Sequence, residues 1–352
     1  MARRSIAEDS AKGSAGSILT FIKGNVMQRF NNIICVISQD SKELTALERA
    51  IALAKSSQAE LTIVEVIDEI PATLKLVDRT LWPRDFLQQR IKKHLNRLDE
   101  MVASLDSGIN IKTRVLSGIA FIEIIREVLR NGHDLLLKTA ESSGLLERLL
   151  GSDDMHLLRK CPCPVWLFKP QTDPSFRCIV AALDVDAYYP AKELTVRSQL
   201  NLQILEMASS LALSESAELH IVYACEALDE ELMNKGLMAG PGSEKEAYIE
   251  KVTQRSRLSL ESLVKKVKLR LEPAANITLK PTIHILNGFP RQQIPEFASQ
   301  IKADLIVMGT VARTGLAGFF MGNTAETILN QLDCSVLATK PDGFNTPVTV
   351  DD

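Results

Sequence analysis

A glycine-rich segment towards the C-terminal end of the chain combines residue types that bind phosphate groups. Its glycines are Gly309, Gly315, Gly318 and Gly322. Glycine lets a backbone approach a ligand closely, and Asn323 followed by Glu326 predicts the capped start of a helix. Because the free amides and partial positive charge of a helix N-terminus attract anions, a phosphate could bind there. The same glycines are also consistent with a series of turns, and both interpretations stay open.

Arg313 lies inside the glycine-rich segment and allows two interpretations. Its guanidinium could lie near phosphate groups, which arginine binds through paired hydrogen bonds. It could equally be a solvated charge on a loop. Neither of two common phosphate-binding sequences, GxxxxGK[ST] and GxGxxG, occurs in the chain, so no standard motif decides between the two interpretations.

Side chains of the kinds that bind metal ions gather between residues 153 and 163. They are Asp153, Asp154, His156, Cys161 and Cys163. Their spacing matches no standard zinc pattern, and the Cys-Pro-Cys sequence leads directly into an apolar run that predicts a strand. We therefore interpret these residues as structural and predict no metal site.

The sequence offers no pair of side chains for nucleophilic catalysis. The other histidines are His94, His133, His220 and His284. They are scattered and form no pattern with Ser or Cys, and nothing marks a general base. The sequence therefore favours a binding protein over an enzyme, and it assigns no catalytic residue.

The chain contains two diverged copies of one sequence, which is the signature of duplication. The matching pairs are 30–38 with 176–184, 59–66 with 217–224, and 163–170 with 334–341. This duplication predicts four parts of the chain: a flexible N-terminal tail over 1–29, a first domain over 30–170, a second domain over 176–341, and a C-terminal tail over 342–352.

Within each copy, short apolar runs alternate with longer amphipathic stretches. The runs 33–37, 61–67 and 178–183 are rich in β-branched residues and Leu, which favours strands buried on both faces of a parallel sheet. Between them, apolar residues recur at helical spacing, as over 44–54. This alternation predicts an α/β fold with two doubly wound, Rossmann-like parallel-sheet sandwiches in tandem. Ligands of such sheets bind at the carboxyl ends of the strands.

The first copy departs from the second at the positions that could bind a ligand. Ser38 stands where the second copy has Asp184, and the glycine matching Gly309 is lost. Asp153 and Asp154 fall in the first turn of a predicted helix, where each carboxylate would complement the helix dipole by about 0.3–1 kcal/mol. They would also repel a phosphate, so we expect no nucleoside triphosphate to bind to the first copy.

Composition excludes several classes of protein. The chain has 352 residues, 45% of them hydrophobic and 5% aromatic, with a net charge of −3. This balance argues against a dedicated nucleic-acid binder and against a base-stacking surface. No apolar run is long enough to span a membrane, and Glu8 and Asp9 interrupt any secretory signal. We therefore expect a cytoplasmic protein with reduced cysteines.

Several features of the second copy resemble universal stress protein domains. They are the turn Gly288-Phe-Pro290, the strand Asp304-Leu-Ile-Val-Met-Gly309, the glycine-rich loop and the closing Cys334-Ser-Val336. The tandem arrangement is similar to the universal stress protein E subfamily, and the resemblance covers about residues 30–341. It implies two sandwiches with an adenine nucleotide alpha hydrolase-like fold.

The resemblance also implies a nucleotide site, with departures from the family pattern. Nucleotide-binding members carry Gly-x-x-Gly, nine residues, and then Gly-Ser or Gly-Thr. The matching positions here are Gly309, Ala312, Gly322 and Asn323. Ala312 adds a methyl group and Asn323 a larger amide, yet backbone amides can still donate to a phosphate.

Two further site residues are implied by the resemblance alone. Asp184 and Ala224 would face the ribose and the adenine of a nucleotide. Because single-domain family members dimerise through their closing strands, segments 165–169 and 336–340 are expected to pair within this chain. The result would be an internal pseudo-dimer, and two such chains could form a homodimer.

These observations lead to two functional hypotheses. The first is a cytoplasmic stress-response protein whose second domain senses ATP, with Mg²⁺, or another small ligand. The alternative is a scaffold or interaction protein that binds no nucleotide and whose sites are vestigial or hold a more apolar ligand. Slow ATP hydrolysis is the most that an enzyme hypothesis allows.

Overall fold

The computed structural model describes most of the chain in nine ranges. They are 30–38, 44–68, 84–105, 107–141, 152–169, 175–187, 189–225, 242–310 and 321–350. The predicted N-terminal tail, residues 1–29, lies outside the described residues.

Each copy is built from strands that alternate with helices, as the apolar runs predicted. The first copy contains β1 (Asn32–Ile37), α1 (Leu44–Ser57), β2 (Glu60–Ile67), α3 (Arg84–Ser104), β3 (Ile111–Ser117), α4 (Ala120–Asn131), β4 (Leu135–Thr139), α5 (Ser152–Lys160) and β5 (Val165–Phe168). The second contains β6 (Cys178–Ala182), α6 (Ala191–Glu215), β7 (Glu218–Cys225), α8 (Gly242–Lys268), α9 (Pro273–Thr278), β8 (Thr282–Asn287), α10 (Pro290–Gln300), β9 (Leu305–Gly309), α11 (Asn323–Leu329) and β10 (Ser335–Thr339).

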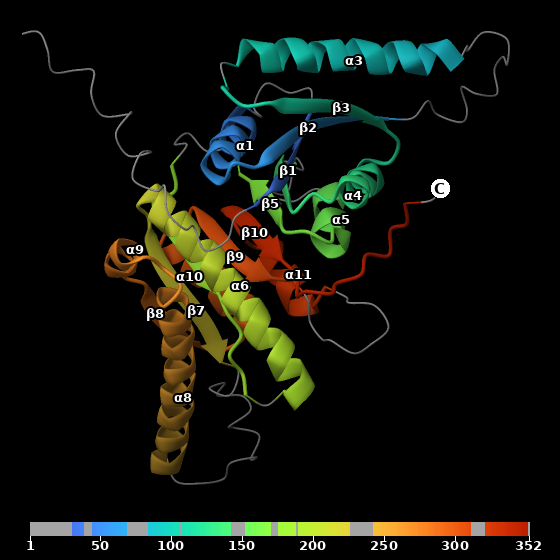
Figure 1. Ribbon diagram of the computed structural model, residues 1–352. Coiled ribbons are helices and arrows are strands. Elements are labelled where there is room, and N and C mark those ends of the chain that lie inside the picture. Colours follow the sequence, from blue (N-terminus) through green and yellow to red (C-terminus); the bar gives the residue numbers. More distant parts are fainter. Residues whose placement is uncertain are drawn as a thin grey trace, which may run out of the picture.

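The strands form one continuous sheet that runs through both copies. Its order is β3-β2-β1-β4-β5-β10-β9-β6-β7-β8, with α3 beside β3 near one end and α8 near β8 at the other (Figure 1). Neighbouring strands within each copy are parallel, and only the pair β5–β10 is antiparallel among the described strands. The predicted α/β class with a parallel sheet is therefore confirmed. The strand order reverses beside β1 and beside β6, which places a ligand crevice at those strands.

Helices cover both faces of the sheet. Apolar side chains of α1, α3, α6 and α8 pack on one face, and those of α4, α5, α10 and α11 pack on the other. Central strands such as β1 are buried on both faces, which explains why their sequences lack polar alternation. Each of the two apolar layers contains residues of both copies, so the duplication produces one continuous core on each side.

In each copy, an aspartate just before the strand on the other side of the crevice (β4 or β9) is hydrogen-bonded to the start of the first strand (β1 or β6). Asp134 accepts hydrogen bonds from the backbone N–H groups of Asn31 and Asn32, at 2.7 and 3.0 Å. Asp304 does the same for Arg177 and Cys178, at 2.7 and 2.9 Å. The aspartate that begins each matching Asp-Leu sequence is therefore explained by the same local contact in both copies.

The two copies meet through their closing strands. In the antiparallel pair β5–β10, Leu167 lies opposite Val336 and Val165 opposite Ala338. The ring of Trp166, between them, stacks on Phe168 with centroids 4.7 Å apart. Pairing removes the two exposed strand edges that separate copies would carry. The predicted internal pseudo-dimer is thus confirmed.

The last described residues lie against the first copy. Arg126 Nε and Arg130 Nη2 of α4 donate hydrogen bonds to the carbonyl oxygens of Thr349 and Val350, each at 3.2 Å. The predicted C-terminal tail therefore contacts the opposite copy over part of its length.

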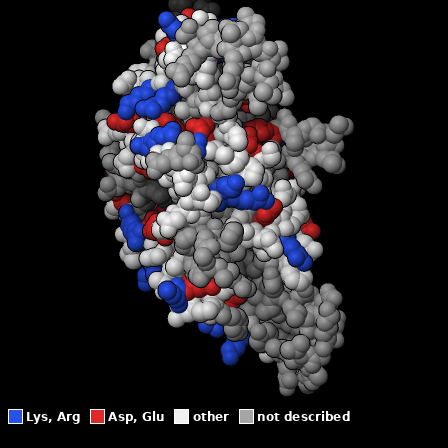
Figure 2. All heavy atoms as spheres, turned by 90° about the vertical axis from the view of Figure 1, so that its right-hand side faces the viewer, with Lys and Arg blue, Asp and Glu red and all other residues white. Residues whose placement is uncertain are grey.

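The surface carries charges of both signs. Lys and Arg side chains alternate with Asp and Glu on the face shown in Figure 2, as the near-neutral composition suggests. None of the described helices is long and apolar enough to cross a membrane.

Candidate functional site

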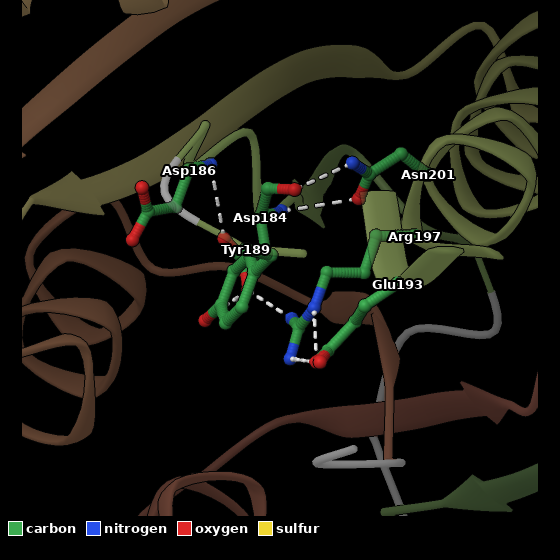
Figure 3. A network of polar contacts seen from close by, with 6 residues as sticks. All are labelled: Asp184, Asp186, Tyr189, Glu193, Arg197 and Asn201. Carbon is green, nitrogen blue, oxygen red and sulfur yellow. Dashed lines mark hydrogen bonds and ion pairs between the residues drawn. The ribbon is translucent and has the colours of Figure 1, made fainter. Parts of the chain in front are cut away.

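Asp184 lies just beyond the carboxyl end of β6, at the crevice between β6 and β9, and its backbone is held by the next helix. The side-chain amide of Asn201, from α6, accepts a hydrogen bond from Asp184 N at 3.1 Å and donates one to Asp184 O at 2.6 Å (Figure 3). Asn201 is buried. This double contact satisfies two backbone groups after the strand has ended, and it fixes where the Asp184 carboxylate points.

The Asp184 carboxylate is the centre of a polar network. One oxygen, Oδ2, pairs with the Arg197 guanidinium and accepts the Tyr189 hydroxyl at 3.2 Å. The other, Oδ1, accepts the backbone N–H of Asp186 at 3.2 Å. Arg197 is held in turn by Glu193, at 2.9 and 3.0 Å, and lies over the Tyr189 ring at 3.7 Å. The Asp184 side chain remains 40% exposed.

Burial and charge act in opposite directions on this network. Burial raises the pKa of Asp184, whereas the Arg197 guanidinium lowers it, and the net shift is upward. Burial, and then the negative charge of Asp184, raise the pKa of Tyr189. The tyrosine hydroxyl therefore keeps its proton and acts as a donor to the carboxylate.

Four of the seven predicted site residues lie along one edge of the sheet. Strand β6 pairs with both β7 and β9, so the ends of these strands are adjacent. Ala224 lies near the end of β7 and Gly309 is the last residue of β9. Gly322 lies at the same edge, because its N–H donates a hydrogen bond to the carbonyl oxygen of Thr310, the residue after Gly309, at 3.1 Å. Ala312 and Arg313 lie outside the described residues.

Gly309 lies in close contact with the Leu200 side chain of α6. A Cβ atom at this position would lie 2.8 Å from Leu200 Cδ2 and 3.4 Å from Leu200 Cγ, closer than side chains normally approach. The glycine thus lets α6 lie against the end of β9. Ala224, at 5% exposure, packs in the core. Both residues therefore have structural roles in addition to any contact with a ligand.

The predicted capping role of Asn323 is wrong by one residue. Gly322 is the N-cap of α11 and no side chain caps the helix, because Gly322 itself has the extended conformation that a cap requires. Asn323 is the exposed first residue of the helix. Glu326 reaches across to the other copy and pairs with Arg159 at the end of α5. It does not fold back on its own helix start.

The matching position of the first copy is occupied by an internal ion pair. Asp154, in the first turn of α5, has no exposed surface. Its Oδ1 lies 2.9 Å from Lys138 Nζ, and its Oδ2 accepts the backbone N–H of Glu141 at 2.7 Å. Lys138 also contacts the Glu141 carboxylate at 2.7 Å. The Asp154 carboxylate thus occupies the Lys138 ammonium and the Glu141 backbone amide, the groups that an anionic ligand would need.

The ionisable groups of this pair are strongly affected by burial. Burial raises the pKa of Asp154, and the Lys138 ammonium opposes that shift. For Lys138, burial lowers the pKa, but Asp154 and Glu141 raise it further, so that the ammonium persists. In the second copy Met308 stands in place of Lys138, and Ala325 in place of Asp154. Only the first copy carries this charged pair.

The residues considered as metal ligands do not form one cluster. The His156 ring stacks on Phe121 with centroids 4.3 Å apart, while Cys161 and Cys163 face one another. No group of three or more His, Cys, Asp or Glu side chains within the described ranges is arranged to hold a metal ion. A cavity of about 430 Å³ lies elsewhere, between α8, α9 and β8.

Comparison with known proteins decides the family. The Universal stress protein family matches residues 29–169 and again 195–340. The chain belongs to the universal stress protein family. The two matches correspond to the two sequence copies, so the tandem arrangement of universal stress protein domains is confirmed.

Relatives in the universal stress protein family align with this chain over nearly their whole length. Universal stress protein E of Escherichia coli K12 is 30% identical over 333 residues, which cover 93% of this chain and 99% of that protein. A universal stress protein E homolog of Haemophilus influenzae is 27% identical and covers 89% of this chain and 98% of that protein. The resemblance to the E subfamily is therefore confirmed over nearly the whole length.

Solved structures agree with the fold. A putative universal stress protein of Pseudomonas aeruginosa UCBPP-PA14 is 27% identical and superposes with a TM-score of 0.62, covering 90% of this chain and 96% of that one. A universal stress protein of Archaeoglobus fulgidus superposes with a TM-score of 0.56 at 17% identity, covering 90% and 98%. The second comparison supports the fold alone.

Sequence reasoning missed four residues that surround Asp184 in this universal stress protein. They are Tyr189, Glu193, Arg197 and Asn201. The last three recur at intervals of four along α6, so they lie on one helix face and turn together towards the end of β6. That spacing was the signal that would have found them.

Proposed function

We propose that this universal stress protein is a cytoplasmic stress-response protein in which only the second domain, 176–341, binds a ligand. The ligand class is an adenine nucleotide such as ATP with Mg²⁺. The first domain, 30–170, acts as a closed partner half. One observation carries the proposal: the buried Lys138–Asp154 pair closes the first copy, and the second copy has Met308 and Ala325 there instead.

The ion pair of the first copy supports its closed role. An anion at the start of α5 would compete with Asp154 for the Lys138 ammonium and for the Glu141 N–H. Removing a buried, paired carboxylate is costly because its partner charge is left unpaired. A phosphate would also approach Asp153, whose carboxylate is half-buried nearby. The first copy therefore disfavours nucleotides for two reasons: Asp154 already occupies the groups that would bind an anion, and the carboxylates there repel a phosphate.

The second copy has the groups that a nucleotide would use. The Asp184 carboxylate, 40% exposed, would accept hydrogen bonds from ribose hydroxyls. Gly322 and Asn323, at the start of α11, together with Ala312 and Arg313 would face the phosphates. Small side chains at Ala224 and Gly309 would border the base. When bound, Mg²⁺ would neutralise part of the phosphate charge.

Calorimetric titration with ATP and Mg²⁺, and with ADP, tests the proposal. We expect one equivalent of nucleotide to bind to the wild-type chain. Met308→Lys/Ala325→Asp transfers the closing pair into the second copy and should abolish binding. The reciprocal variant Lys138→Met/Asp154→Ala is the matched control and should keep the equivalent bound to the second domain, because it leaves that domain unchanged. Absence of binding at millimolar nucleotide, with Mg²⁺ present, would overturn the proposal.

A scaffold with vestigial sites is the second candidate, and the state of Asp184 favours it. Its carboxylate already contacts Arg197, Tyr189 and the Asp186 amide, and Gly309 is explained by the packing of Leu200. Mass spectrometry of small molecules released when the purified protein is denatured separates the candidates. Stoichiometric nucleotide contradicts the scaffold. An apolar molecule, or none together with failed titrations, supports it.

A further inference from the structure

Two thiols and one ammonium group lie at the junction between the copies. Cys161 and Cys163 flank Pro162 between α5 and β5, and their Sγ atoms lie 3.5 Å apart. Lys340 follows β10, and the antiparallel register that puts Ala338 opposite Val165 runs on, two residues further, towards Lys340 opposite Cys163. The residues are 0%, 7% and 6% exposed, respectively, and Lys340 Nζ is buried with no hydrogen-bond acceptor among the residues that the structure describes.

The pseudo-symmetric lysine shows what Lys340 lacks. Lys169, which matches Lys340 in the first copy, pairs with the carboxylate of Asp333 and donates to Asp333 O at 3.0 Å. The residue that matches Asp333 on the other side is Pro162, which has no carboxylate to pair with Lys340. Lys340 Nζ instead lies over the Phe344 ring, 5.1 Å from the ring centroid.

A buried ammonium without an acceptor is costly, and it stabilises any neighbouring group that can become an anion. The groups near Lys340 that can do so are the thiols of Cys161 and Cys163, which interact electrostatically with it. Asp134 also acts on Cys163, but its carboxylate is held by the N–H groups of Asn31 and Asn32. The ammonium therefore acts mainly on the two sulfur atoms.

The two thiols differ in acidity. Burial raises the pKa of Cys161, but the hydrogen bond with Cys163 and the charge of Lys340 lower it below the value of an ordinary thiol. The hydrogen bond with Cys161 and burial raise the pKa of Cys163. Cys334, which matches Cys163 in the second copy, is also buried. Burial and Asp333 raise the pKa of Cys334 to about 12, so the pseudo-symmetric side has no acidic thiol.

We propose that Cys161 and Cys163 form a redox-active dithiol that hydroperoxides oxidise to an intramolecular disulfide, with Cys161 as the attacking thiolate and Lys340 as its charge partner. Thiolates are the reactive form of cysteine and are stabilised by adjacent lysine. The same ammonium would repel a metal cation, which makes an electrophilic oxidant the better partner for this pair.

The oxidation balances in two steps. The Cys161 thiolate attacks one oxygen of the hydroperoxide, an S–O bond forms, and the O–O bond breaks. The leaving alkoxide or hydroxide takes a proton from Lys340, which regains one from solvent. Cys163 then attacks the sulfenic sulfur, the S–S bond forms, and water leaves with the Cys163 proton. Two thiols lose two electrons, and the hydroperoxide is reduced to an alcohol, or to water, with a second water released.

The geometry requires a small movement. A disulfide needs the sulfur atoms about 2.0 Å apart, so the present contact of 3.5 Å must shorten. Both residues lie in the short connection between α5 and β5, and local opening of such a connection admits a molecule as small as hydrogen peroxide. Neither helix nor strand has to unfold.

Treatment of the reduced full-length protein with hydrogen peroxide, followed by peptide mass spectrometry, tests the proposal. We expect the peptide that contains Cys161 and Cys163 to lose two hydrogen masses. Timed alkylation at neutral pH should modify Cys161 at least about tenfold faster than Cys334 in the same molecules, since one pKa unit is a tenfold change in thiolate. Equal rates, or an unchanged peptide after peroxide, would overturn the proposal.

Three variants separate the roles. Cys163→Ser should stop the reaction at a Cys161 sulfenic acid, which dimedone traps. Lys340→Met should slow alkylation of Cys161 about tenfold and leave Cys334 unchanged, and Lys340→Arg should restore the rate. If Cys161 in Lys340→Met reacts as in the wild type, the charge partner is wrongly assigned. If the Lys340→Met variant unfolds, Cys334 becomes reactive in it as well. The ratio of the Cys161 and Cys334 alkylation rates in the wild type then decides whether the proposal holds.

Discussion

Arg49 of α1 bonds to Glu215 at the end of α6, with Nη1 2.7 Å from Oε1, and so links the two copies on one face of the sheet. The Arg49 guanidinium also lies 4.0 Å from the centroid of the Phe176 ring. Both charged side chains are mostly buried, at 13% and 22% exposure. On the opposite face, Arg159 and Glu326 also pair between copies, but there both partners are about one-third exposed.

Arg49→Ala should therefore destabilise the chain more than Arg159→Ala. The first change removes a shielded ion pair and a cation–π contact, and it leaves Glu215 half-buried, for an expected loss of about 1–3 kcal/mol in the free energy of unfolding. The second breaks a solvated pair, at about 0–1 kcal/mol. Urea denaturation of both variants measures the difference. Equal losses would show that the Arg49 contacts add nothing to an ordinary surface pair.

Gly309→Ala tests whether this glycine serves packing. The new methyl group would meet Leu200 Cδ2 at 2.8 Å, and overpacking of this kind costs about 1–3 kcal/mol. Leu200→Ala removes the obstacle, so the double variant should lose less stability than the two single losses together. Urea denaturation of all three variants gives the coupling energy. Strict additivity would contradict the packing role.

Asp154→Ala should destabilise the first copy strongly. It leaves Lys138 buried, with Glu141 as the remaining carboxylate, and breaking a buried pair typically costs about 3–5 kcal/mol. The contact with Glu141 places the expected loss near the lower end. Lys138→Met/Asp154→Ala removes both charges, as in the second copy, and should be more stable than the single variant. Thermal denaturation followed by circular dichroism compares them, and a double variant less stable than the single one would contradict this account.

The sequence predicted the elements better than the contacts between side chains. Apolar runs identified the buried strands because parallel strands covered on both faces leave no polar alternation, and the family resemblance predicted the pairing of β5 with β10. The carboxylate of Asp154 was expected to lie at a helix start, and it does. Its burial against Lys138 could not be predicted because the lysine lies within an apolar strand, five residues long and fully buried.

The candidate site shows the same limit. Asn323 was expected to cap α11, but a cap depends on backbone angles, and Gly322 adopts the required ones. The contacts of Asp184 with Arg197 and Tyr189 depend on how the connection after β6 folds over α6. Periodicity places Arg197 on one face of α6, but neither periodicity nor composition shows where the connection after β6 puts Asp184 and Tyr189.

Lys340 should make stability depend on pH in the alkaline range. Burial lowers the pKa of Lys340 to about 8, whereas an unfolded lysine titrates near 10.4. Between these values the unfolded chain binds more protons than the folded one, so the free energy of unfolding rises with pH. The rise from this residue should reach about 2–3 kcal/mol between roughly pH 8 and 10.

Urea denaturation at several pH values, with Lys340→Met as the reference and both proteins carrying Cys161→Ser/Cys163→Ser, separates this contribution from the titration of the two thiols. Methionine keeps the length of the side chain without a charge, so the protein with Lys340 should gain stability relative to the variant as the pH rises from about 8. Below pH 8 both the folded and the unfolded protein with Lys340 carry the ammonium, and the difference between the two proteins should be constant. Parallel stability curves across the alkaline range would mean that Lys340 keeps its proton in the folded protein, which would require an acceptor close to Nζ.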